Sequence, residues 1–400
     1  MKIVFFVHPA FMPSQSMPRF AHMLEKCMCE RGHIIEIWSP TARAVKLKVP
    51  QGIKKWLGYV DQYILFPNEV RKRIHECALD TLFVFTDHAQ GPWVPLIADR
   101  PHVIHCHDFL AQQSALGNIP ENPTSWSGRQ YQAFIRRGYS KGKNFISVSS
   151  RTRDQLHALL SSIPACSEVV YNALNQSFPP LDISQSRRQL GSQTGLSLEA
   201  GYLLHVGGNQ WYKNRVGVID VYDAWRDHSA VSLPLLMIGA SPDAKLMERF
   251  QQSPHKANIH LLTDLDNEAV KRAYSGASVF LFPSLAEGFG WPIAEAMASG
   301  CPVITTDEAP MTEVAGKAGF LMHRRPVAKA EIRTWAEKAT QLVNTVISLS
   351  PEARRDVIKV GKENVERFDL ACYAETIEAI YQSVLAGHDE RKNETILVRA

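Results

Sequence analysis

Two glutamates, Glu287 and Glu295, stand eight positions apart in the segment SLAEGFGWPIAEAMASGCPVIT, residues 284–305. Pro292 fits the first turn of a helix, whose free N–H groups form a binding site for an anion. A phosphate there would have one carboxylate on each flank for hydroxyl groups, which describes a sugar on one side and a ribose on the other. The alternative interpretation is that Glu295 only favours the helix dipole and that Glu287 lies in a surface loop.

A second segment, HVGGNQWYKN at residues 205–214, combines a strand end, two glycines and a lysine. Gly207 and Gly208 allow a tight turn and the close approach of a ligand, and the following helix directs its N–H groups to the same place. Lys213 adds a mobile positive charge that suits a diphosphate. A plain strand-to-helix turn has the same pattern, so both interpretations stay open. Neither a dinucleotide fingerprint nor a P-loop is present.

Length and composition predict a protein of two domains. The chain has 400 residues, of which 45% are hydrophobic and 21% charged, and it is long enough for two cores. No window approaches 18 uninterrupted apolar residues, and the apolar run at residues 3–7 is too short for a signal peptide. We therefore expect a cytoplasmic protein without a membrane span. The seven cysteines are scattered, which predicts reduced thiols and no zinc site.

The net charge of +4 is unevenly distributed, with +7 in residues 1–172 and −3 in the rest. The basic excess lies beside apolar residues such as Trp56 and Leu57, a combination that suits an anionic membrane surface or an acidic acceptor. A solvated basic face is the alternative. Nucleic-acid binding is disfavoured because no reading motif accompanies these residues. The basic residues concerned are Lys46, Lys48, Lys54, Lys55, Arg71, Lys72, Arg73, Arg136, Arg137, Lys141 and Lys143.

Strand-like apolar runs alternate with helix-like runs twice along the chain, which predicts two parallel sheets, each covered by helices on both faces. We predict a first Rossmann-like domain at residues 1–175, a linker rich in Ser, Gln and Pro at 176–200, and a second Rossmann-like domain at 201–371. A helix at 372–388 is expected to join the first domain. Ligands bind beyond the carboxyl ends of the strands in such sheets, so the site is expected in the cleft between the domains.

The segment around the two glutamates resembles the E-x7-E signature of the retaining glycosyltransferases of family 4. Further segments resemble the same family in the same order: RGHIIEIWSP, VIHCHDF, VVYNALN and AYSGASVFLFPS. The resemblance implies an α/β protein of the GT-B fold, with two doubly wound Rossmann-like domains facing a central cleft. It also implies transfer of a hexose, with retained anomeric configuration, from a nucleotide-diphosphate sugar to a glycan, lipid-linked or small-molecule acceptor. Neither a metal nor another cofactor is then needed.

Within this resemblance, Glu295 would bind the ribose hydroxyls of the donor, and Glu287 would face the transferred sugar. Lys213 and the backbone amides of residues 289–291 would hold the diphosphate and stabilise its charge as it leaves. The implied donor-binding residues are Gly207, Gly208, Asn209, Lys213, Glu287, Gly288, Phe289, Gly290, Trp291 and Glu295.

The chain departs from the family at Gly208, where members commonly have an arginine that pairs with the lysine. Either Arg215 or Asn209 would substitute for it, or Lys213 and the amides would suffice. Asp264 follows a predicted strand in the sequence DLD, where a turn or a contact to the nucleobase is expected.

In the first domain, His107 matches the family histidine that lies near the donor sugar and the acceptor, so it joins Lys213 and Glu287 as a catalytic residue. His105 is expected to alternate to the opposite face of its strand and to pack there. Asp87 and His88 end a predicted strand and would meet the acceptor. The first loop lacks the paired glycines of the family, and its candidate site residues are Ser14, Gln15 and Ser16.

Two other functions stay open. A sugar phosphorylase or a nucleotide-sugar epimerase of the GT-B fold would use a related cleft, although the E-x7-E arrangement and Lys213 fit these less specifically. A non-catalytic nucleotide-sugar-binding module would keep the donor site without turnover, and Gly208 in place of the arginine favours it. The sequence does not identify the nucleobase, the sugar, the acceptor, the linkage or the oligomeric state.

Overall fold

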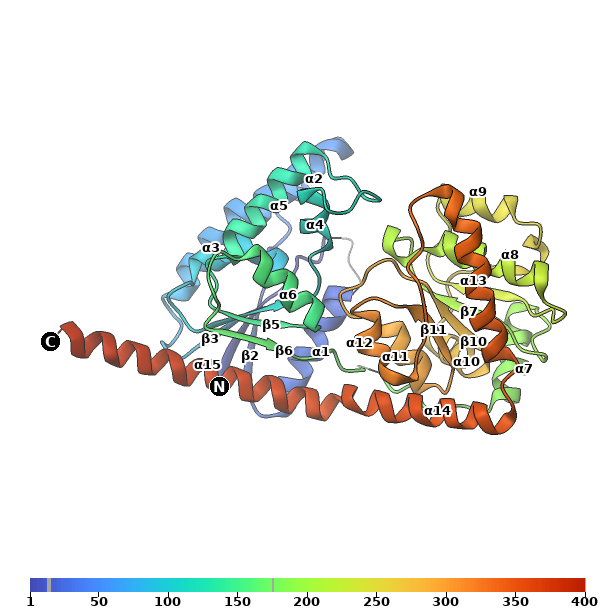
Figure 1. The fold of residues 1–400 in the computed structure, drawn as a ribbon. Coiled ribbons are helices and arrows are strands. Elements are labelled where there is room, and N and C mark those ends of the chain that lie inside the picture. The colour runs from blue at the N-terminus through green and yellow to red at the C-terminus, as the bar shows by residue number, and fades with distance from the viewer. Residues whose placement is uncertain (13–15, 175, 400) are drawn as a thin grey trace. The chain divides into compact units, whose positions relative to one another are not determined.

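The computed structural model describes residues 1–12, 16–174 and 176–399, without the side chains of residues 16, 51, 52 and 389–399. The chain forms two compact units: residues 1–171 with the segment from 370 onward, and residues 172–369. Each unit contains one parallel sheet with helices on both faces (Figure 1). The expected α/β, GT-B type of architecture, built from two doubly wound Rossmann-like units, is confirmed.

The first unit has a six-stranded sheet in the order β2-β1-β3-β4-β5-β6. One face packs against α3, the turns of η3, α5 and α6, and the other face packs against α1 and α15. The strands are β1 (Lys2–Phe6), β2 (Ile34–Trp38), β3 (Leu82–Phe85), β4 (His102–Cys106), β5 (Asn144–Ser147) and β6 (Cys166–Val169). The helices are α1 (Ser16–Glu30), η1 (Ala44–Lys46), α2 (Gln51–Val60), η2 (Asp61–Leu65), α3 (Phe66–Ile74), η3 (His88–Leu96), α4 (Leu110–Leu116), α5 (Trp126–Tyr139), α6 (Ser150–Leu159) and α15 (Leu370–Arg399).

The second unit has a six-stranded sheet in the order β12-β11-β10-β7-β8-β9. Its strands are β7 (Leu203–Val206), β8 (Leu235–Ile238), β9 (Ile259–Leu262), β10 (Val279–Phe282), β11 (Val303–Thr306) and β12 (Phe320–Met322). Its helices are α7 (Ile183–Thr194), η4 (Trp211–Lys213), α8 (Arg215–His228), α9 (Ala244–Gln252), η5 (Lys256–Asn258), α10 (Asn267–Gly276), α11 (Trp291–Ala298), α12 (Met311–Ala315), η6 (Gly316–Ala318), α13 (Lys329–Ile347), α14 (Pro351–Val365) and η7 (Glu366–Phe368).

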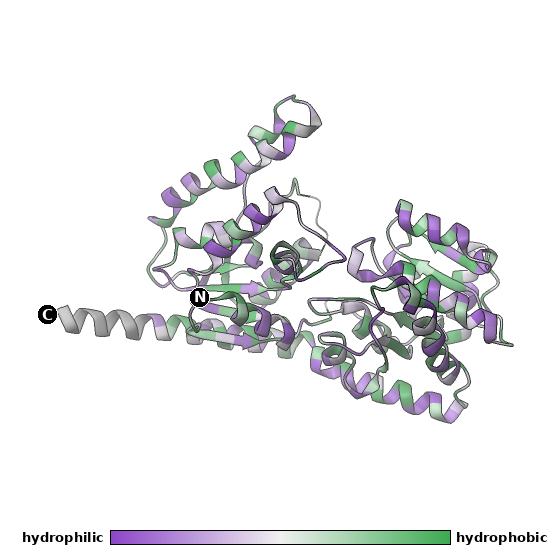
Figure 2. Cartoon of the chain, turned by 45° about the horizontal axis from the view of Figure 1, so that its top comes forward, coloured by the Kyte–Doolittle hydropathy of each residue, from purple (hydrophilic) through white to green (hydrophobic). Residues whose placement is uncertain are grey.

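Inner strands such as β1, β3, β8 and β10 are apolar along all or almost all of their length because both faces of each sheet are covered. In β1, for example, Val4 and Phe6 pack on one side and Ile3 and Phe5 on the other, and all four are fully buried. Figure 2 shows the consequence as strands that are mostly green between helices in which purple and green alternate. Within the described residues, no helix is both long enough and apolar enough to span a bilayer.

The segment predicted as a linker, residues 176–200, differs from that expectation because it contains α7. Its polar composition hides a buried side formed by Ser186, Leu190 and Gly191. Arg187 Nε also donates a hydrogen bond of 2.8 Å to the Gly276 carbonyl at the end of α10. These contacts make α7 part of the second unit.

The C-terminal helix α15 belongs to the first unit, where it lies against α1 and β4. Tyr381 and Ile377 are fully buried on its packed side. Tyr381 Oη and His105 Nε2 form a hydrogen bond of 2.8 Å, and Glu378 pairs with His33 at 2.7 Å and with Arg31. A segment distant in sequence therefore completes the core of this unit.

Replacing Tyr381 by Phe is expected to lower the free energy of unfolding by about 1–3 kcal/mol, because a buried histidine nitrogen loses its partner. The measurement is urea unfolding followed by tryptophan fluorescence. Gln382→Ala, on the exposed side of the same helix, is the control and should leave the unfolding midpoint unchanged. An unchanged midpoint for Tyr381→Phe would contradict the role assigned to this bond.

Candidate functional site

The ligand site of the second unit is expected where its strand order reverses. The chain runs outward from β7 through β8 to β9 on one side, and from β10 through β11 to β12 on the other. The connections after β7 and β10 therefore leave the sheet in opposite directions and open a crevice at the carboxyl ends of these two strands. Lys213 follows β7 and Glu287 follows β10, so the topology directs both residues to this crevice.

Lys213 and Glu287 form a close ion pair there, with 2.8 Å between Nζ and Oε1. Ser284 Oγ donates a second hydrogen bond, of 2.9 Å, to the same carboxylate oxygen. The ammonium group lies 5.0 Å from the ring centroid of Phe282 and 5.5 Å from that of Tyr212. Only 14% of the lysine side chain and 7% of the glutamate side chain are exposed. Because water screens this pair little, an entering anion would compete with Glu287 for the ammonium group.

Asn214 fixes Lys213 opposite Glu287. Its backbone has a left-handed conformation, with φ of 51°, which ends η4 and begins α8. The side-chain Oδ1 accepts a hydrogen bond from the Gly217 amide at 3.2 Å, and Nδ2 donates one of 2.8 Å to the Pro283 carbonyl. The turn after β7 is thereby tied directly to the end of β10.

Helix α11 begins four residues after Glu287, with Gly290 as its N-cap at φ of 108°, a conformation that favours glycine. Pro292 lies in the first turn, as predicted. Phe289 is buried, with its ring centroid 5.3 Å from that of Phe368, and Trp291 Nε1 donates a hydrogen bond of 3.1 Å to the Ala173 carbonyl. The amides of the first turn are thus held by packing next to the ion pair.

Glu295 is buried in α11 and accepts a hydrogen bond of 3.1 Å from the Tyr274 hydroxyl of α10. If Glu295 only stabilised the helix dipole, it would not need this hydrogen-bond partner. The bond from Tyr274 fixes the orientation of the Glu295 carboxylate. The structure therefore gives the two glutamates different surroundings, one against a lysine and the other against a phenol.

Asn209 and Arg215, the two candidates to replace the family arginine, are joined to each other. Arg215 Nη1 donates hydrogen bonds of 2.5 Å to Asn209 Oδ1 and 2.8 Å to the Ala240 carbonyl, and Asn209 Nδ2 donates one of 2.6 Å to the Ser241 carbonyl. Both side chains hold the loop after β8 against the turn after β7. At Gly208, a Cβ atom would approach only the flexible end of the Gln210 side chain.

Asp264 has a left-handed backbone, with φ of 58°, in the loop after β9, which agrees with the expected turn. Asp266 Oδ1 accepts a hydrogen bond of 2.7 Å from the Ala269 amide and caps α10. The second aspartate of the DLD sequence, Asp266, is therefore a helix cap. Asp264 lies at the carboxyl edge of the sheet, just after β9.

The first unit has a cluster at its own point of strand reversal, between β1 and β3. His8 Nε2 donates a hydrogen bond of 2.8 Å to Asp87 Oδ2, and His88 Nδ1 lies 3.1 Å from Asp87 Oδ1. Burial alone would raise the pKa of Asp87, but the contacts with the two histidines hold it well below its usual value. Asp87 also caps η3 through the Ala89 amide. His8 was missed as a site residue from the sequence, although it directly follows a predicted strand, whereas His88 was named there together with Asp87.

His107 is buried, and its Nε2 donates a hydrogen bond of 2.8 Å to the Thr86 carbonyl. Burial lowers its pKa, an effect partly offset by the charge of Asp87. The expectation that His105 lies on the opposite face is wrong: the Phe20 ring lies 5.3 Å from His105 and 4.3 Å from His107. Residues two apart in a strand share a face. His105 does pack, as expected.

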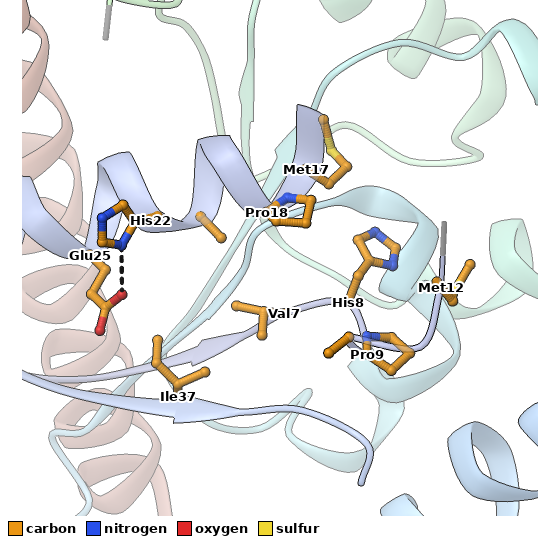
Figure 3. Close-up of a pocket in the computed structure, with 11 residues that line it drawn as sticks. Val7, His8, Pro9, Met12, Met17, Pro18, His22, Glu25 and Ile37 are labelled. Carbon is orange, nitrogen blue, oxygen red and sulfur yellow. Dashed lines mark ion pairs between the residues drawn. The ribbon is translucent and has the colours of Figure 1, made fainter. Parts of the chain in front are cut away.

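A pocket of about 420 Å³ opens beside His8, between the end of β1 and α1 (Figure 3). Its walls are apolar except for His8 and for the His22–Glu25 pair, whose atoms are 3.6 Å apart. Of the candidate site residues in the adjoining loop, Ser14 and Gln15 lie outside the described residues. Ser16 is the first residue of α1, and its side chain is likewise not described.

Within the described residues, no group of three His, Cys, Asp or Glu side chains could hold a metal ion. The same part of the chain contains no disulfide among its seven cysteines.

Two family profiles match the sequence. Residues 17–178 match "Glycosyltransferase Family 4" and residues 200–345 match "Glycosyl transferases group 1", which together span more than three quarters of the chain. The chain belongs to glycosyltransferase family 4. The resemblance noted from the E-x7-E segment is thereby confirmed.

Relatives of this family 4 chain include two O-antigen mannosyltransferases. O-antigen chain mannosyltransferase B of Escherichia coli is 31% identical over 123 residues, which are 30% of this chain and 32% of the relative. O-antigen chain mannosyltransferase RfbU of Salmonella typhimurium is 27% identical over 188 residues, 46% and 48% of the two chains. The chain thus matches about a third to a half of the length of these curated relatives.

The fold of the family 4 chain resembles that of several solved structures over almost its whole length. Sucrose-phosphate synthase from Thermosynechococcus elongatus superposes with a TM-score of 0.71 at 15% identity, covering 96% of this chain and 99% of the other. Anabaena HepE in complex with UDP has a TM-score of 0.69 at 15% identity, covering 96% and 100%. At such identities the likeness concerns the fold alone.

Acid is expected to destabilise the protein through His105 and His205, because burial lowers the pKa of each to about 3. An unfolded histidine has a pKa of about 6.5. Between these values the unfolded state binds more protons, so stability is lost as the pH falls below about 6.5. Each of the two histidines should lower the free energy of unfolding by about 2 kcal/mol between pH 7 and pH 5.

His205 offers the sharper test, since it lies under the site and its Nδ1 donates to the Leu281 carbonyl at 3.0 Å. Urea unfolding at pH 7 and pH 5 should show that His205→Phe reduces the pH dependence by about 2 kcal/mol. His22→Phe, at a mostly exposed side chain, is the control. Equal pH dependence in wild type and His205→Phe would contradict the assignment.

Proposed function

We propose that the protein is a retaining hexosyltransferase that moves a sugar from a nucleotide-diphosphate sugar to a glycan, lipid-linked or small-molecule acceptor. The observation that carries this proposal is the shielded Lys213–Glu287 pair at the strand reversal of the second unit, next to the first turn of α11. A diphosphate needs a cation and amides, and a sugar needs a carboxylate for its hydroxyl groups. The names of the O-antigen relatives support mannose as the transferred sugar.

In this proposal the diphosphate displaces Glu287 as the main partner of Lys213. The freed carboxylate then accepts hydrogen bonds from the sugar, while Ser284 keeps it oriented. As the bond between the anomeric carbon and the diphosphate oxygen breaks, the diphosphate leaves with the electron pair. Lys213 and the amides of Phe289, Gly290 and Trp291 stabilise the developing charge without a metal ion. Glu295, oriented by Tyr274, binds the ribose hydroxyls.

The acceptor is proposed to bind at the carboxyl edge of the first sheet, near His8, Asp87 and His107. The Asp87 carboxylate accepts a hydrogen bond from Nε2 of His8, so in the neutral ring the proton lies on Nε2. The other ring nitrogen, Nδ1, then carries the lone pair that can accept a proton. Nδ1 would take the proton of the acceptor hydroxyl as the new glycosidic bond forms. His107, which donates to the Thr86 carbonyl, would contact the donor sugar or the acceptor.

We further propose a cytoplasmic location at the inner face of a membrane, with the basic first unit directed to the bilayer. Reduced thiols throughout the described residues support the compartment, and the charge excess in residues 1–172 supports the surface. A non-catalytic nucleotide-sugar-binding module is the second candidate. Gly208, in place of the family arginine, is the observation that favours it.

Replacing Lys213 or Glu287 by Ala is expected to lower the turnover rate at least about 100-fold, because each removes a charge that the transition state uses. A thermal-shift screen with UDP-, GDP-, ADP- and TDP-sugars first identifies the donor, which at 100 times its Kd adds about 2.7 kcal/mol of stability. Release of the nucleoside diphosphate then measures turnover, with and without EDTA.

Lys245→Ala, at an exposed lysine on α9 of the same unit, is the matched control and should keep full activity. Normal turnover in either site variant would refute the site. A donor that binds but is never turned over would favour the non-catalytic module.

Replacing His8 by Asn should lower the turnover rate about 100-fold without changing the thermal shift caused by the donor, because a proton acceptor is lost while the proposed diphosphate and ribose contacts of the second unit remain. His22→Asn, on the other side of the same pocket, controls for local disturbance. A wild-type turnover rate in His8→Asn would contradict the role of His8.

A further inference from the structure

Two helices of the first unit run parallel and bring their first turns to the same end of the unit. The ring centroids of Tyr59 and Tyr131 are 5.3 Å apart, and those of Tyr63 and Phe134 are also 5.3 Å apart. The residue numbers of both partners rise together from the first contact to the second. The helix formed by α2 and η2 therefore runs parallel to α5. The beginnings of α2, at residue 51, and α5, at residue 126, thus lie at one tip of the unit.

The segments at this tip are rich in basic residues and contain no acidic ones. Residues 43–57 contain five Lys or Arg and no Asp or Glu, and residues 122–131, around the start of α5, contain Arg129 and no acidic residue. Arg43 is held by Glu69 at 3.3 Å, whereas the lysines of these segments are exposed. We call the following six residues the basic tip: Lys46, Lys48, Lys54, Lys55, Trp56 and Trp126.

The two tryptophans of the basic tip are far more exposed than a core residue would be, Trp56 at 62% and Trp126 at 76%. Residues 53–56 are all exposed, so this turn of α2 projects from the unit instead of lying on it. Exposed tryptophans beside lysines match the composition of protein segments at a membrane–water interface, where the ring enters the headgroup region and the ammonium groups meet anionic lipids.

The basic tip is held rigidly by groups below it. Asp61 is buried in η2, and its carboxylate accepts hydrogen bonds from the amides of Arg43, Ala44 and Val45 at 2.8–3.1 Å, which fixes the turn that carries Lys46. The Tyr63 and Tyr131 hydroxyls form a hydrogen bond of 2.7 Å between η2 and α5. A surface that is preorganised in this way loses little conformational freedom on docking.

We infer that the basic tip is the surface with which the protein docks on an anionic lipid bilayer, and that Trp56 and Trp126 insert into the headgroup region. The inference rests on the proposed location at a membrane and identifies the surface of the protein that contacts the bilayer. A soluble acidic partner would need the lysines but not two protruding tryptophans. An uncharged polysaccharide would need the aromatic rings but not the lysines. A bilayer with anionic headgroups uses both.

Cosedimentation of the full chain with vesicles tests the inference. Binding is expected to vesicles of phosphatidylcholine with 30% phosphatidylglycerol, to weaken as salt is raised, and to be absent with phosphatidylcholine alone. Lys54→Ser with Lys55→Ser should weaken binding about 25-fold, at about fivefold per lysine. Trp56→Ser with Trp126→Ser should weaken it at least about tenfold and remove the blue shift of tryptophan emission.

Two controls separate the basic tip from general effects of charge and apolarity. Lys359→Ser with Lys362→Ser removes two exposed lysines of the second unit, and Ile163→Ser removes an apolar side chain that is 94% exposed. Both should bind vesicles as the wild type does. An unchanged thermal shift with the donor shows that every variant is folded. Because vesicle binding is measured without turnover, its result does not depend on the transfer reaction.

Failure of the wild type to bind phosphatidylglycerol vesicles would overturn the inference. Equal binding by the two tip variants and the wild type would overturn the assignment of the surface, and equal binding to uncharged vesicles would overturn the electrostatic contact. The wild type could instead be retained on an uncharged polysaccharide column without binding vesicles, and the tryptophan variant could lose that retention. This result would show that the surface binds a glycan and not a bilayer.

Discussion

Coverage of both faces of each sheet is the constraint on which the rest of the structure depends. Strands such as β3, β8 and β10 are buried throughout, so every side chain along them is apolar. Functional polar groups then have no place except at the strand ends and in the loops that follow. The chemistry of this protein is therefore concentrated at the carboxyl edges of its two sheets.

At both edges, the charged groups gather where the strand order reverses. In the second unit the reversal between β7 and β10 brings Lys213 to Glu287, 74 positions later in the chain. In the first unit the reversal between β1 and β3 brings His8 to Asp87. Each pair has a partner that sets its orientation, Ser284 in the first case and His88 in the second. One topological rule thus accounts for two sites of different chemistry.

The pairing of Lys213 with Glu287 also has an energetic consequence for a ligand. A buried ion pair offsets the cost of removing both charges from water only while both partners are present. A diphosphate sugar can replace the carboxylate on the lysine and offer hydroxyl groups to the glutamate, so neither charge is left alone. The same pair that stabilises the empty site can therefore select a ligand that carries both an anion and hydroxyl groups.

Local sequence patterns were enough to predict the two αβ repeats, the position of Pro292 in the first turn of α11 and the residue types of the proposed donor site, because these depend on periodicity and on short motifs. The sequence could not determine that residues 183–194 form a packed helix, since only α10 reveals which side of that polar segment is buried. Nor could it show that His8 meets Asp87, that Arg215 holds Asn209, or that α2 and α5 share one tip. These contacts join residues distant in sequence or commit a side chain to one partner among several, and only the tertiary structure decides between such partners.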